Sequence, residues 1–486
     1  MANTLLVAPY SLWTPHLETD LELALDSVEQ GDQVTWLECR GELGVCDMNP
    51  DGRVSRCARC VSRRELGISR AGLDVRRVSV SELLTSEDRA ALDGLPEQFE
   101  SLEQLRAFRF AGFDAGFAAL SSTVWIAQDS DLDLTAEPHA SRMRGLLRSG
   151  CAMYLATRRI LATERYSSAY LFNGRMAPLR GAFRALREEG IYTSIHERGC
   201  DLQHYALSPN ALPHEIKPMD SRIRAAWRDA PEAREDRIRI AMDWYDQRVQ
   251  GHSTNWRSFT EDQMQGRLPK SWDAQAHNIV IFTTTEYEFA AISDEWNNPL
   301  YKTNAAAVMG VIDECRSIKG VSLYVRMHPN TAGLDNQSTR QLLHAAGNNI
   351  EIIEPESDIS TYSLAAHASK VVVTGSSVGI EAAVRGGAAI LLGRCYYENL
   401  GSVHVPTSRA EVRKLLMDQQ LQGLDPLGAH MYGFFMATFG ERFTRFDASG
   451  LFEGKFMGEE IRPSRWSQRL RRLQLASIRF LGHGQV

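Results

Sequence analysis

Short apolar segments alternate with segments of helical periodicity along the chain, and this alternation constrains the fold more than any other feature. An apolar run over residues 4–8 is followed by apolar side chains at helical spacing over residues 17–28. Gly31 ends this helix, and residues 33–37 form the next apolar run. Because a strand–helix–strand order is typical of parallel sheets, the sequence predicts an α/β protein.

The alternation continues in two blocks, separated by residues 213–275, which are charged and rich in tryptophan and indicate a helical connector. Further strands are predicted over residues 123–127, 168–172, 191–195, 278–283, 321–326, 370–374 and 388–392. Two such blocks predict two Rossmann-like domains facing a cleft. The expected divisions are an N-terminal domain over residues 1–212, the connector over 213–275, a C-terminal ligand-binding domain over 276–430, and a helical extension with a basic tail over 431–486.

The charge of the chain is unevenly distributed. The 486 residues include 54 basic and 61 acidic side chains, and the net charge of -7 argues against a general nucleic-acid binder. Residues 461–486 carry six arginines and no acid. In this tail Trp466, Leu470, Leu473 and Phe480 recur at near-helical spacing. The tail therefore forms either an amphipathic helix on an anionic membrane surface or a closing helix packed across both domains with its arginines in solvent.

The sequence also predicts a compartment. The segment over residues 1–13 has no basic residue before its apolar run and no small-residue cleavage site, so we expect no signal peptide. No stretch approaches roughly 18 apolar residues, so we expect no membrane span. We therefore predict a cytoplasmic protein with reduced cysteines, peripheral at the inner face of the membrane if the tail binds lipid.

One candidate binding motif follows the strand over residues 370–374. The strand stops at Gly375, and the hydroxyls of Ser376 and Ser377 lie where a helix is expected to begin. This arrangement is typical of a phosphate site, and Glu381, one turn further on, is within reach of a ribose hydroxyl. The alternative is an ordinary capped helix, because serine is a preferred N-cap.

Two other strand ends belong to the same half of the chain. Arg326 and His328 end the strand over residues 321–326, and Thr284 follows the strand over residues 278–283. The carboxyl ends of parallel strands face the ligand crevice, so these side chains would contact phosphates or a sugar. The alternative is a polar strand end with a satisfied histidine.

These motifs resemble a known family. Residues 326–330, 374–383 and 391–394 look like the C-terminal half of bacterial capsule and surface-polysaccharide glycosyltransferases of GT-B type, similar to Kdo and sialic acid transferases. In that family His-Pro and Ser-Ser motifs hold a nucleotide-sugar donor. The resemblance extends to residues 172–175 and 196–199, and the same motifs occur in looser form in sugar epimerases and polyol-phosphate transferases.

The resemblance implies roles for the motif residues. His328 would contact the donor nucleotide or its phosphate, Ser376 and Ser377 would bind the phosphate end, Glu381 would hold the ribose, and Arg326 would offset the donor charge. N–H dipoles and cations can stabilise a phosphate leaving group, so we expect no catalytic metal.

Transfer to a hydroxyl needs a general base, for which the sequence offers several candidates. His16 is expected to open the first helix, where an unperturbed pKa of about 6.5 would suit proton transfer. The rivals are Asp129, Asp131 and Glu197, and in the resembling Kdo and sialic acid transferases the base is usually a carboxylate. A surface histidine remains the alternative for His16.

Other polar residues follow strands of the N-terminal half. Asn173 and Arg175 come after the strand over residues 168–172, and Arg198 comes after the strand over residues 191–195. They would lie near the cleft and contact the acceptor or an acidic sugar. The alternative for each is a loop with a solvent-exposed charge.

Four cysteines form a separate signal. Cys39, Cys46, Cys57 and Cys60 fall within 22 residues that are rich in turn-forming side chains. Four thiolates around one ion would make a structural zinc site, with an iron–sulfur cluster as a second choice. Their spacing matches no standard zinc motif, so simple reduced cysteines are the alternative.

Taken together, the sequence predicts an enzyme that transfers a sugar from a CMP-, UDP- or GDP-linked donor to a surface or capsular glycan or a lipid-linked acceptor. The first alternative is a nucleotide-sugar epimerase of the same fold, which would need no acceptor. The second is a non-catalytic, metal-stabilised scaffold of a polysaccharide assembly complex.

Overall fold

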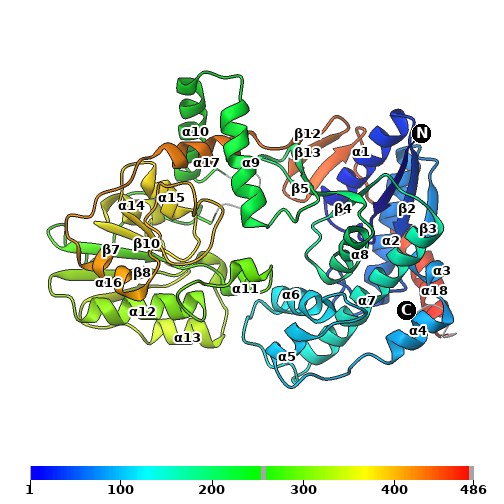
Figure 1. Cartoon of the computed structure of the whole chain (residues 1–486), viewed down its shortest axis with the longest axis horizontal. Coiled ribbons are helices and arrows are strands. Elements are labelled where there is room, and N and C mark those ends of the chain that lie inside the picture. Colours follow the sequence, from blue (N-terminus) through cyan, green and yellow to red (C-terminus); the bar gives the residue numbers. More distant parts are fainter. Residues whose placement is uncertain (1, 253–258, 481–486) are drawn as a thin grey trace. The chain divides into compact units, whose positions relative to one another are not determined.

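The computed structural model of the chain describes residues 2–252 and 259–480, and it divides into two compact units (Figure 1). Unit 1 consists of Met1–Ala127, Leu132–Pro213 and Gly440–Val486, and unit 2 consists of Gln128–Asp131 and His214–Phe439. Each unit has its own sheet and its own hydrophobic core. Each is therefore described by itself.

Unit 1 is built on a seven-stranded sheet with the order β12-β6-β5-β4-β1-β2-β3. Its strands are β1 (Asn3–Val7), β2 (Gln33–Glu38), β3 (Arg76–Ser79), β4 (Ser168–Phe172), β5 (Tyr192–Arg198), β6 (His204–Pro209) and β12 (Glu441–Arg442). The first five are parallel, whereas β6 and β12 pair antiparallel at one edge. The chain order reverses between β1 and β4, which is the switch point of a Rossmann-like sheet.

Helices cover this sheet. They are α1 (His16–Glu29), α2 (Val54–Arg70), α3 (Val80–Leu83), α4 (Ser86–Asp93), α5 (Leu102–Ala107), α6 (Ala115–Ala127), α7 (His139–Thr163), α8 (Ala177–Glu188) and α18 (Arg465–Phe480). Leu6 of β1, Trp36 of β2 and Leu21 of α1 are buried in one core cluster. The helical periodicity of residues 17–28 thus reflects one face of α1 packed on the sheet.

Two regions of unit 1 differ from the sequence prediction. Residues 123–127 were expected to form a strand, but this prediction is wrong because they form the last part of α6. Thr123 and Val124 are buried there, so packing overrides the β-propensity of this segment. Within the expected helical extension, the strands β12, β13 (Phe446–Gly450) and β14 (Glu453–Phe456) precede α18, and β13 and β14 form an antiparallel pair.

Unit 2 is built on a five-stranded, entirely parallel sheet with the order β11-β10-β7-β8-β9. Its strands are β7 (His277–Phe282), β8 (Val321–Arg326), β9 (Ile350–Ile353), β10 (Lys370–Val373) and β11 (Ala389–Leu391). If these strands are numbered by their order in the chain and the sheet is read from β9, the strand order is 3-2-1-4-5, as for the five parallel strands of unit 1. The switch point lies between β7 and β10. The predicted α/β class with two Rossmann-like units is confirmed by the two sheets.

Helices cover both faces of the unit 2 sheet. They are α9 (Ile216–Asp229), α10 (Arg234–Val249), α11 (Glu286–Phe289), α12 (Asn304–Arg316), α13 (Gln337–Leu343), α14 (Thr361–His367), α15 (Val378–Ala383), α16 (Arg409–Met417) and α17 (Leu427–Thr438), with short 3-10 helices η1 (Asp294–Trp296) and η2 (Pro329–Thr331). Val280 packs with Tyr245 of α10 on one face, and Ile281 packs with Val308 of α12 on the other. The α9–α10 segment, expected as a connector, is therefore part of the unit 2 core.

The helices also bear on the membrane prediction. None of those in the described part of the chain is long and apolar enough to cross a bilayer.

Candidate functional site

Unit 2 contains a cavity of about 240 Å³ at the carboxyl ends of β7, β8 and β10. Its lining residues are Arg248, His252, Phe259, Thr260, Gln263, Phe282, Thr283, Arg326, Met327, His328, Pro329, Thr361, Tyr362, Ser376, Ser377 and Val378. The cavity therefore lies at the switch point of the sheet, where ligands bind in such folds. Four of the predicted donor-binding residues meet here: Arg326, His328, Ser376 and Ser377.

Arg326 supplies a buried positive charge to this cavity. The residue is 2% exposed at the end of β8, and its guanidinium donates hydrogen bonds to the carbonyls of Glu354 and Ser357. Its Nε–H has no hydrogen-bond partner, and none of the described carboxylates forms an ion pair with it. Burial lowers the pKa of Arg326 to about 10, while the negative charge of Glu356 acts in the opposite direction, so the side chain is charged at neutral pH. A buried cation without a paired anion favours an anionic ligand.

His328 lies next to this charge in a defined orientation. Its backbone N–H donates to Thr283 Oγ1 over 3.0 Å, and its Nδ1 accepts a hydrogen bond from the backbone N–H of Asn330 over 3.1 Å. Burial, and secondarily the charge of Arg326, lowers the pKa of His328 to about 4. The ring is therefore neutral at pH 7, and its proton lies on Nε2, since Nδ1 accepts. His328 is thus a hydrogen-bond donor rather than a cation.

Ser377 and Glu381 are joined through a residue that the sequence motifs did not include. Arg248 of α10 donates from Nη2 to Ser377 Oγ and from Nε to Glu381 Oε1, both over 3.0 Å. Glu381 is 5% exposed and lines a neighbouring cavity rather than this one. Its carboxylate therefore fixes Arg248 on the cavity wall, and its predicted contact with a ribose stays a prediction.

Gly375 and Thr284 shape the ends of β10 and β7. Gly375 has a φ of +142°, and a Cβ there would lie 2.9 Å from the carbonyl oxygen of Arg394, so only glycine fits without strain. The hydroxyls of Thr284 and Thr374 are 3.0 Å apart and link the two strand ends. Thr284 lines a smaller cavity of about 40 Å³ next to the main one.

Several residues of the cavity wall were missed from the sequence. Arg248 and Gln263 come from the segment interpreted as a connector, and Tyr362 lies in the first turn of α14. The ring of Phe259 stands edge-on to that of His328, with 5.1 Å between their centroids. The charged, tryptophan-rich composition of residues 213–275 indicated a helical connector between domains rather than part of a site.

The predicted base His16 lies at the carboxyl edge of the unit 1 sheet. His16 begins α1, as expected, and its ring centroid lies 3.7 Å from that of Phe172. Burial, followed by the neighbouring His196, lowers the pKa of His16 well below its usual value. His196 itself bonds Asp20 through Nε2 over 2.9 Å. His16 is therefore a neutral and weakly basic ring at pH 7.

The predicted acceptor-side residues lie along the same edge, with partners of their own. Asn173 donates from Nδ2 to Glu197 over 2.7 Å, and burial raises the pKa of that carboxyl. Arg198 donates to the carbonyl of Thr14 over 3.0 Å, and Arg175 donates from Nε to Ser121 Oγ over 2.8 Å. The ends of β4 and β5 thus bring the predicted residues of unit 1 together.

Asp129 does not belong to this group. It lies in the short segment Gln128–Asp131, which belongs to unit 2, and it follows the helix α6 rather than a strand. Its Oδ1 accepts a hydrogen bond from the backbone N–H of Asp131 over 3.0 Å, which is a local turn.

The cysteine cluster forms no metal-ligand geometry in the described residues. Cys39, Cys46, Cys57 and Cys60 form no disulfide, and burial raises the pKa of Cys39, Cys46 and Cys60. In the described parts of the chain, three or more possible metal ligands lie within 4.8 Å of one another only at another place. Zinc or iron at the predicted cluster would require these sulfur atoms to move closer together, and the metal stays a prediction.

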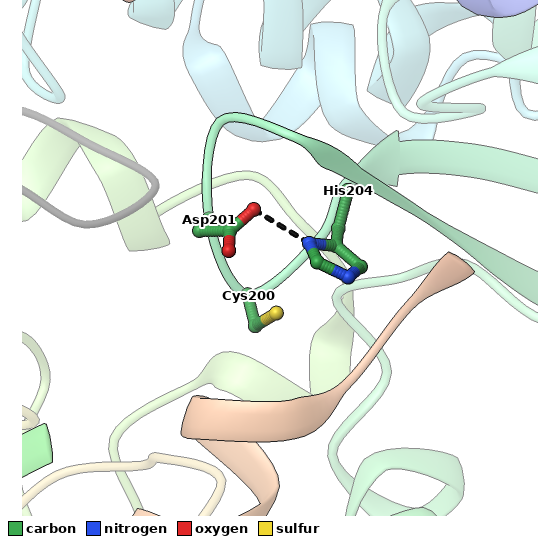
Figure 2. Close-up of side chains that lie close together, drawn as sticks. All are labelled: Cys200, Asp201 and His204. Carbon is green, nitrogen blue, oxygen red and sulfur yellow. Dashed lines mark hydrogen bonds and ion pairs between the residues drawn. The ribbon is translucent and has the colours of Figure 1, made fainter. Parts of the chain in front are cut away.

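That other place is the turn between β5 and β6, where Cys200, Asp201 and His204 lie together (Figure 2). Asp201 Oδ1 lies 2.6 Å from His204 Nδ1 and also accepts the backbone N–H of Gln203 over 2.7 Å. Burial raises the pKa of Cys200 to about 11, so its thiol is protonated at neutral pH. The carboxylate and the imidazole therefore already satisfy each other in the turn.

Comparisons with known proteins give no family assignment. No protein-family model and no curated protein sequence matches the chain. Similar solved structures include a β-Kdo 2,4-transferase, KpsC of Thermosulfurimonas dismutans, at 12% identity over 63% of this chain and 87% of that chain, with a TM-score of 0.36. MurG of Acinetobacter baumannii covers 89% of this chain and 94% of its own at 13% identity and a TM-score of 0.26.

A putative UDP-N-acetylglucosamine 2-epimerase of Listeria monocytogenes is also similar, at 12% identity over 90% of this chain and 93% of that chain, with a TM-score of 0.25. Likeness at these levels does not identify an activity. The site itself has to carry any functional conclusion.

Proposed function

We propose that the protein is a glycosyltransferase that holds a nucleotide-sugar donor in the unit 2 cavity. The observation that carries this proposal is the buried Arg326 guanidinium, which lines a switch-point cavity, has an unpartnered Nε–H and forms no ion pair with a described carboxylate. A phosphate or diphosphate would supply the missing negative charge. The resemblance of the motifs around His328 and Ser376 to GT-B glycosyltransferases supports the same ligand class.

The other wall residues suit the remaining parts of such a donor. Nε2–H of the neutral His328 and the hydroxyls of Ser376 and Ser377 would donate hydrogen bonds to phosphate oxygens. Arg248, fixed by Glu381, would add a second cation. The rings of Phe259 and Tyr362 offer apolar surface for a nucleobase.

These groups would also favour the reaction. When the bond between the anomeric carbon and the phosphate oxygen breaks, the nucleotide leaves with that electron pair, and its negative charge is stabilised by Arg326 and Arg248. The acceptor hydroxyl attacks the anomeric carbon and loses its proton to a base. Among the predicted bases, Glu197 suits this role better than His16, because burial raises the pKa of Glu197 and lowers that of His16.

The acceptor is proposed to be a surface or capsular glycan, free or lipid-linked, and the enzyme to act in the cytoplasm. The choice of acceptor depends on the family resemblance. The donor sugar and base are left to experiment, since the cavity wall offers groups for any nucleoside diphosphate or monophosphate.

A thermal-shift screen with CMP, UDP and GDP and their sugars tests the donor site. A ligand that binds only the folded protein raises its melting temperature, and we expect this for one nucleotide series. His328→Asn and Ser377→Ala should lose most of the shift, whereas His344→Asn and Ser317→Ala, at exposed positions of the same unit, should retain it. No shift with any nucleotide, or a full shift in the two cavity variants, would refute the donor site.

Turnover separates transferase from epimerase and scaffold. A transferase consumes the sugar nucleotide in proportion to added acceptor glycan. An epimerase converts it without an acceptor, and a scaffold leaves it unchanged. Chromatography of the nucleotide sugars with and without acceptor distinguishes these outcomes.

A further inference from the structure

The helix α18 carries an exposed apolar row that no other part of the described chain covers. Trp466, Leu470 and Leu473 are 67%, 45% and 60% exposed, and their spacing of four and three residues places them on one face of the helix. On no other described helix or strand do three exposed large apolar side chains occur at such spacing. An aligned row of this kind indicates an interaction surface.

The opposite face of α18 anchors the helix to unit 1. Leu475 is 6% exposed and packs against Cys57 and Ala58 of α2, beside which α18 lies (Figure 1). Arg471 is only partly exposed, and its charge adds to that of Arg77, the main cause, in lowering the pKa of Glu65 on α2. Because α18 is already held on its Leu475 side, the apolar row faces away from α2.

A row of arginines runs beside the apolar row. Arg465, Arg469 and Arg472 each precede one of the three apolar residues, so they share the same spacing and form an adjacent stripe. All three are exposed, and within the described residues they form no ion pair. The helix contains no aspartate or glutamate. The exposed side of α18 is thus apolar along one line and uniformly positive along the next.

We propose that α18 binds the surface of an anionic lipid bilayer. Trp466, Leu470 and Leu473 would enter the interface between head groups and acyl chains, and the arginines would contact lipid phosphates. Charge complementarity favours an anionic bilayer over a second copy of α18, because two copies would bring two positively charged arginine stripes together. The side chains of residues 478–480, including the predicted Phe480, lie outside the described set and are not needed for this surface.

This binding is independent of the proposed donor site, which lies in unit 2, whereas α18 belongs to unit 1. A variant with weakened nucleotide binding, such as His328→Asn, should bind vesicles like the wild type. The two proposals can therefore fail separately.

Sedimentation with vesicles tests the proposal on the full chain. The wild type should bind vesicles of phosphatidylglycerol mixed with phosphatidylcholine, and salt should weaken the binding. Phosphatidylcholine alone should bind at least about 100-fold less, since near the surface each of the three arginines contributes roughly fivefold to anionic-membrane affinity. Equal binding to both vesicle types, or binding to neither, would overturn the proposal.

Two variants, each with a matched control, assign the effect to α18. Replacing Arg465, Arg469 and Arg472 by Gln should lower affinity for anionic vesicles about 100-fold, at roughly fivefold per arginine. The same change at the exposed Arg228, Arg239 and Arg340 of unit 2 should have little effect. Replacing Trp466, Leu470 and Leu473 by Ser should abolish binding, whereas Met264→Ser, at a position 55% exposed, should not.

Light scattering during size-exclusion chromatography tests whether the apolar row instead binds a second copy of the protein. The proposal predicts the same mass for the wild type and for the variant with Ser at residues 466, 470 and 473. If the wild type is a dimer and this variant a monomer, the apolar row is an interface between two copies, and the membrane proposal is wrong.

Discussion

The carboxyl edges of the two sheets share a strand order but differ in how their charges are paired. In unit 2, Arg326 lines a cavity and forms no ion pair with a carboxylate among the described residues. In unit 1, Arg63 forms an ion pair with Glu18, and His196 bonds Asp20. The comparison shows that topology determines where polar side chains collect. The pairing of their charges then determines whether the charges at an edge are satisfied within the protein or are available to bind an anion.

The largest effect is expected when the paired charges of unit 1 are broken. Arg63→Ala leaves the buried Glu18 without its partner and removes the hydrogen bonds of Arg63 to the Ser11 carbonyl and Thr14 Oγ1, so it should destabilise unit 1 by about 3–5 kcal/mol. Chemical unfolding followed by circular dichroism measures this loss. Arg56→Ala, at an exposed position of α2, is the control and should change the unfolding free energy little. Equal stability of the two variants would contradict the contrast between the units.

The next largest effect concerns ligand affinity in unit 2. Arg326→Met removes the charge that a phosphate would neutralise, so nucleotide affinity should fall about 30-fold or more. The loss of folding stability should be smaller than for Arg63→Ala, because Arg326 forms no direct ion pair with a described carboxylate, whereas Arg63 forms one with Glu18. Titration calorimetry measures the affinity, with Arg340→Met as the control at an exposed position of the same unit. Unchanged affinity in Arg326→Met would remove the basis of the proposed site.

The buried histidines of both units should make stability depend on pH. Burial lowers the pKa of His328 to about 4, below its value of about 6.5 in the unfolded chain. Between these values the unfolded state binds a proton that the folded state does not, so stability is complete above pH 6.5 and falls as the pH drops toward 4. Urea unfolding of His328→Asn should show a shallower slope in this window. A slope identical to that of the wild type, with the exposed His344→Asn as reference, would mean that His328 is not buried as described.

His16 should act in the same direction in unit 1. Its pKa is lowered well below the usual value, mainly by burial. His16→Asn should therefore also flatten the loss of stability below about pH 6.5. The two histidines lie in different units, so their effects should add in the double variant.

The smallest effect is expected for a residue that acts through another. Glu381→Gln keeps the size of the side chain but removes the charge that holds Arg248, so nucleotide affinity should fall about two- to tenfold. A residue that bound the ribose directly would instead discriminate between ribo- and deoxyribonucleotides. Titration of both nucleotides into Glu381→Gln separates these roles. Loss of ribose discrimination in the variant would restore the original prediction for Glu381.

Much of this contrast could be predicted from the sequence, because it depends on strand ends. The runs over residues 4–8, 168–172 and 321–326 form β1, β4 and β8, and the polar residues that follow them lie at the carboxyl edges as expected. The prediction of a strand over residues 123–127 is wrong because β-branched and aromatic side chains also occur in buried helices such as α6. A local pattern cannot reveal this without the packing partners.

The composition of the cavity wall was harder to predict. Arg248 reaches Ser377 from a helix more than a hundred residues earlier in the chain. Arg248 also donates to Glu381, the residue to which the motif assigns a ribose contact. A long-range partner such as Arg248 can bind the polar side chains that a motif assigns to a ligand. Such a contact leaves no local pattern in the sequence.

The most direct test of the central claim is a crystal structure of the protein with the nucleotide identified in the screen. The account predicts its phosphate within hydrogen-bond distance of Arg326 and of Nε2 of His328, with the Arg248–Glu381 pair intact. A nucleotide bound elsewhere, or bound in this cavity with its phosphate away from Arg326, would contradict it.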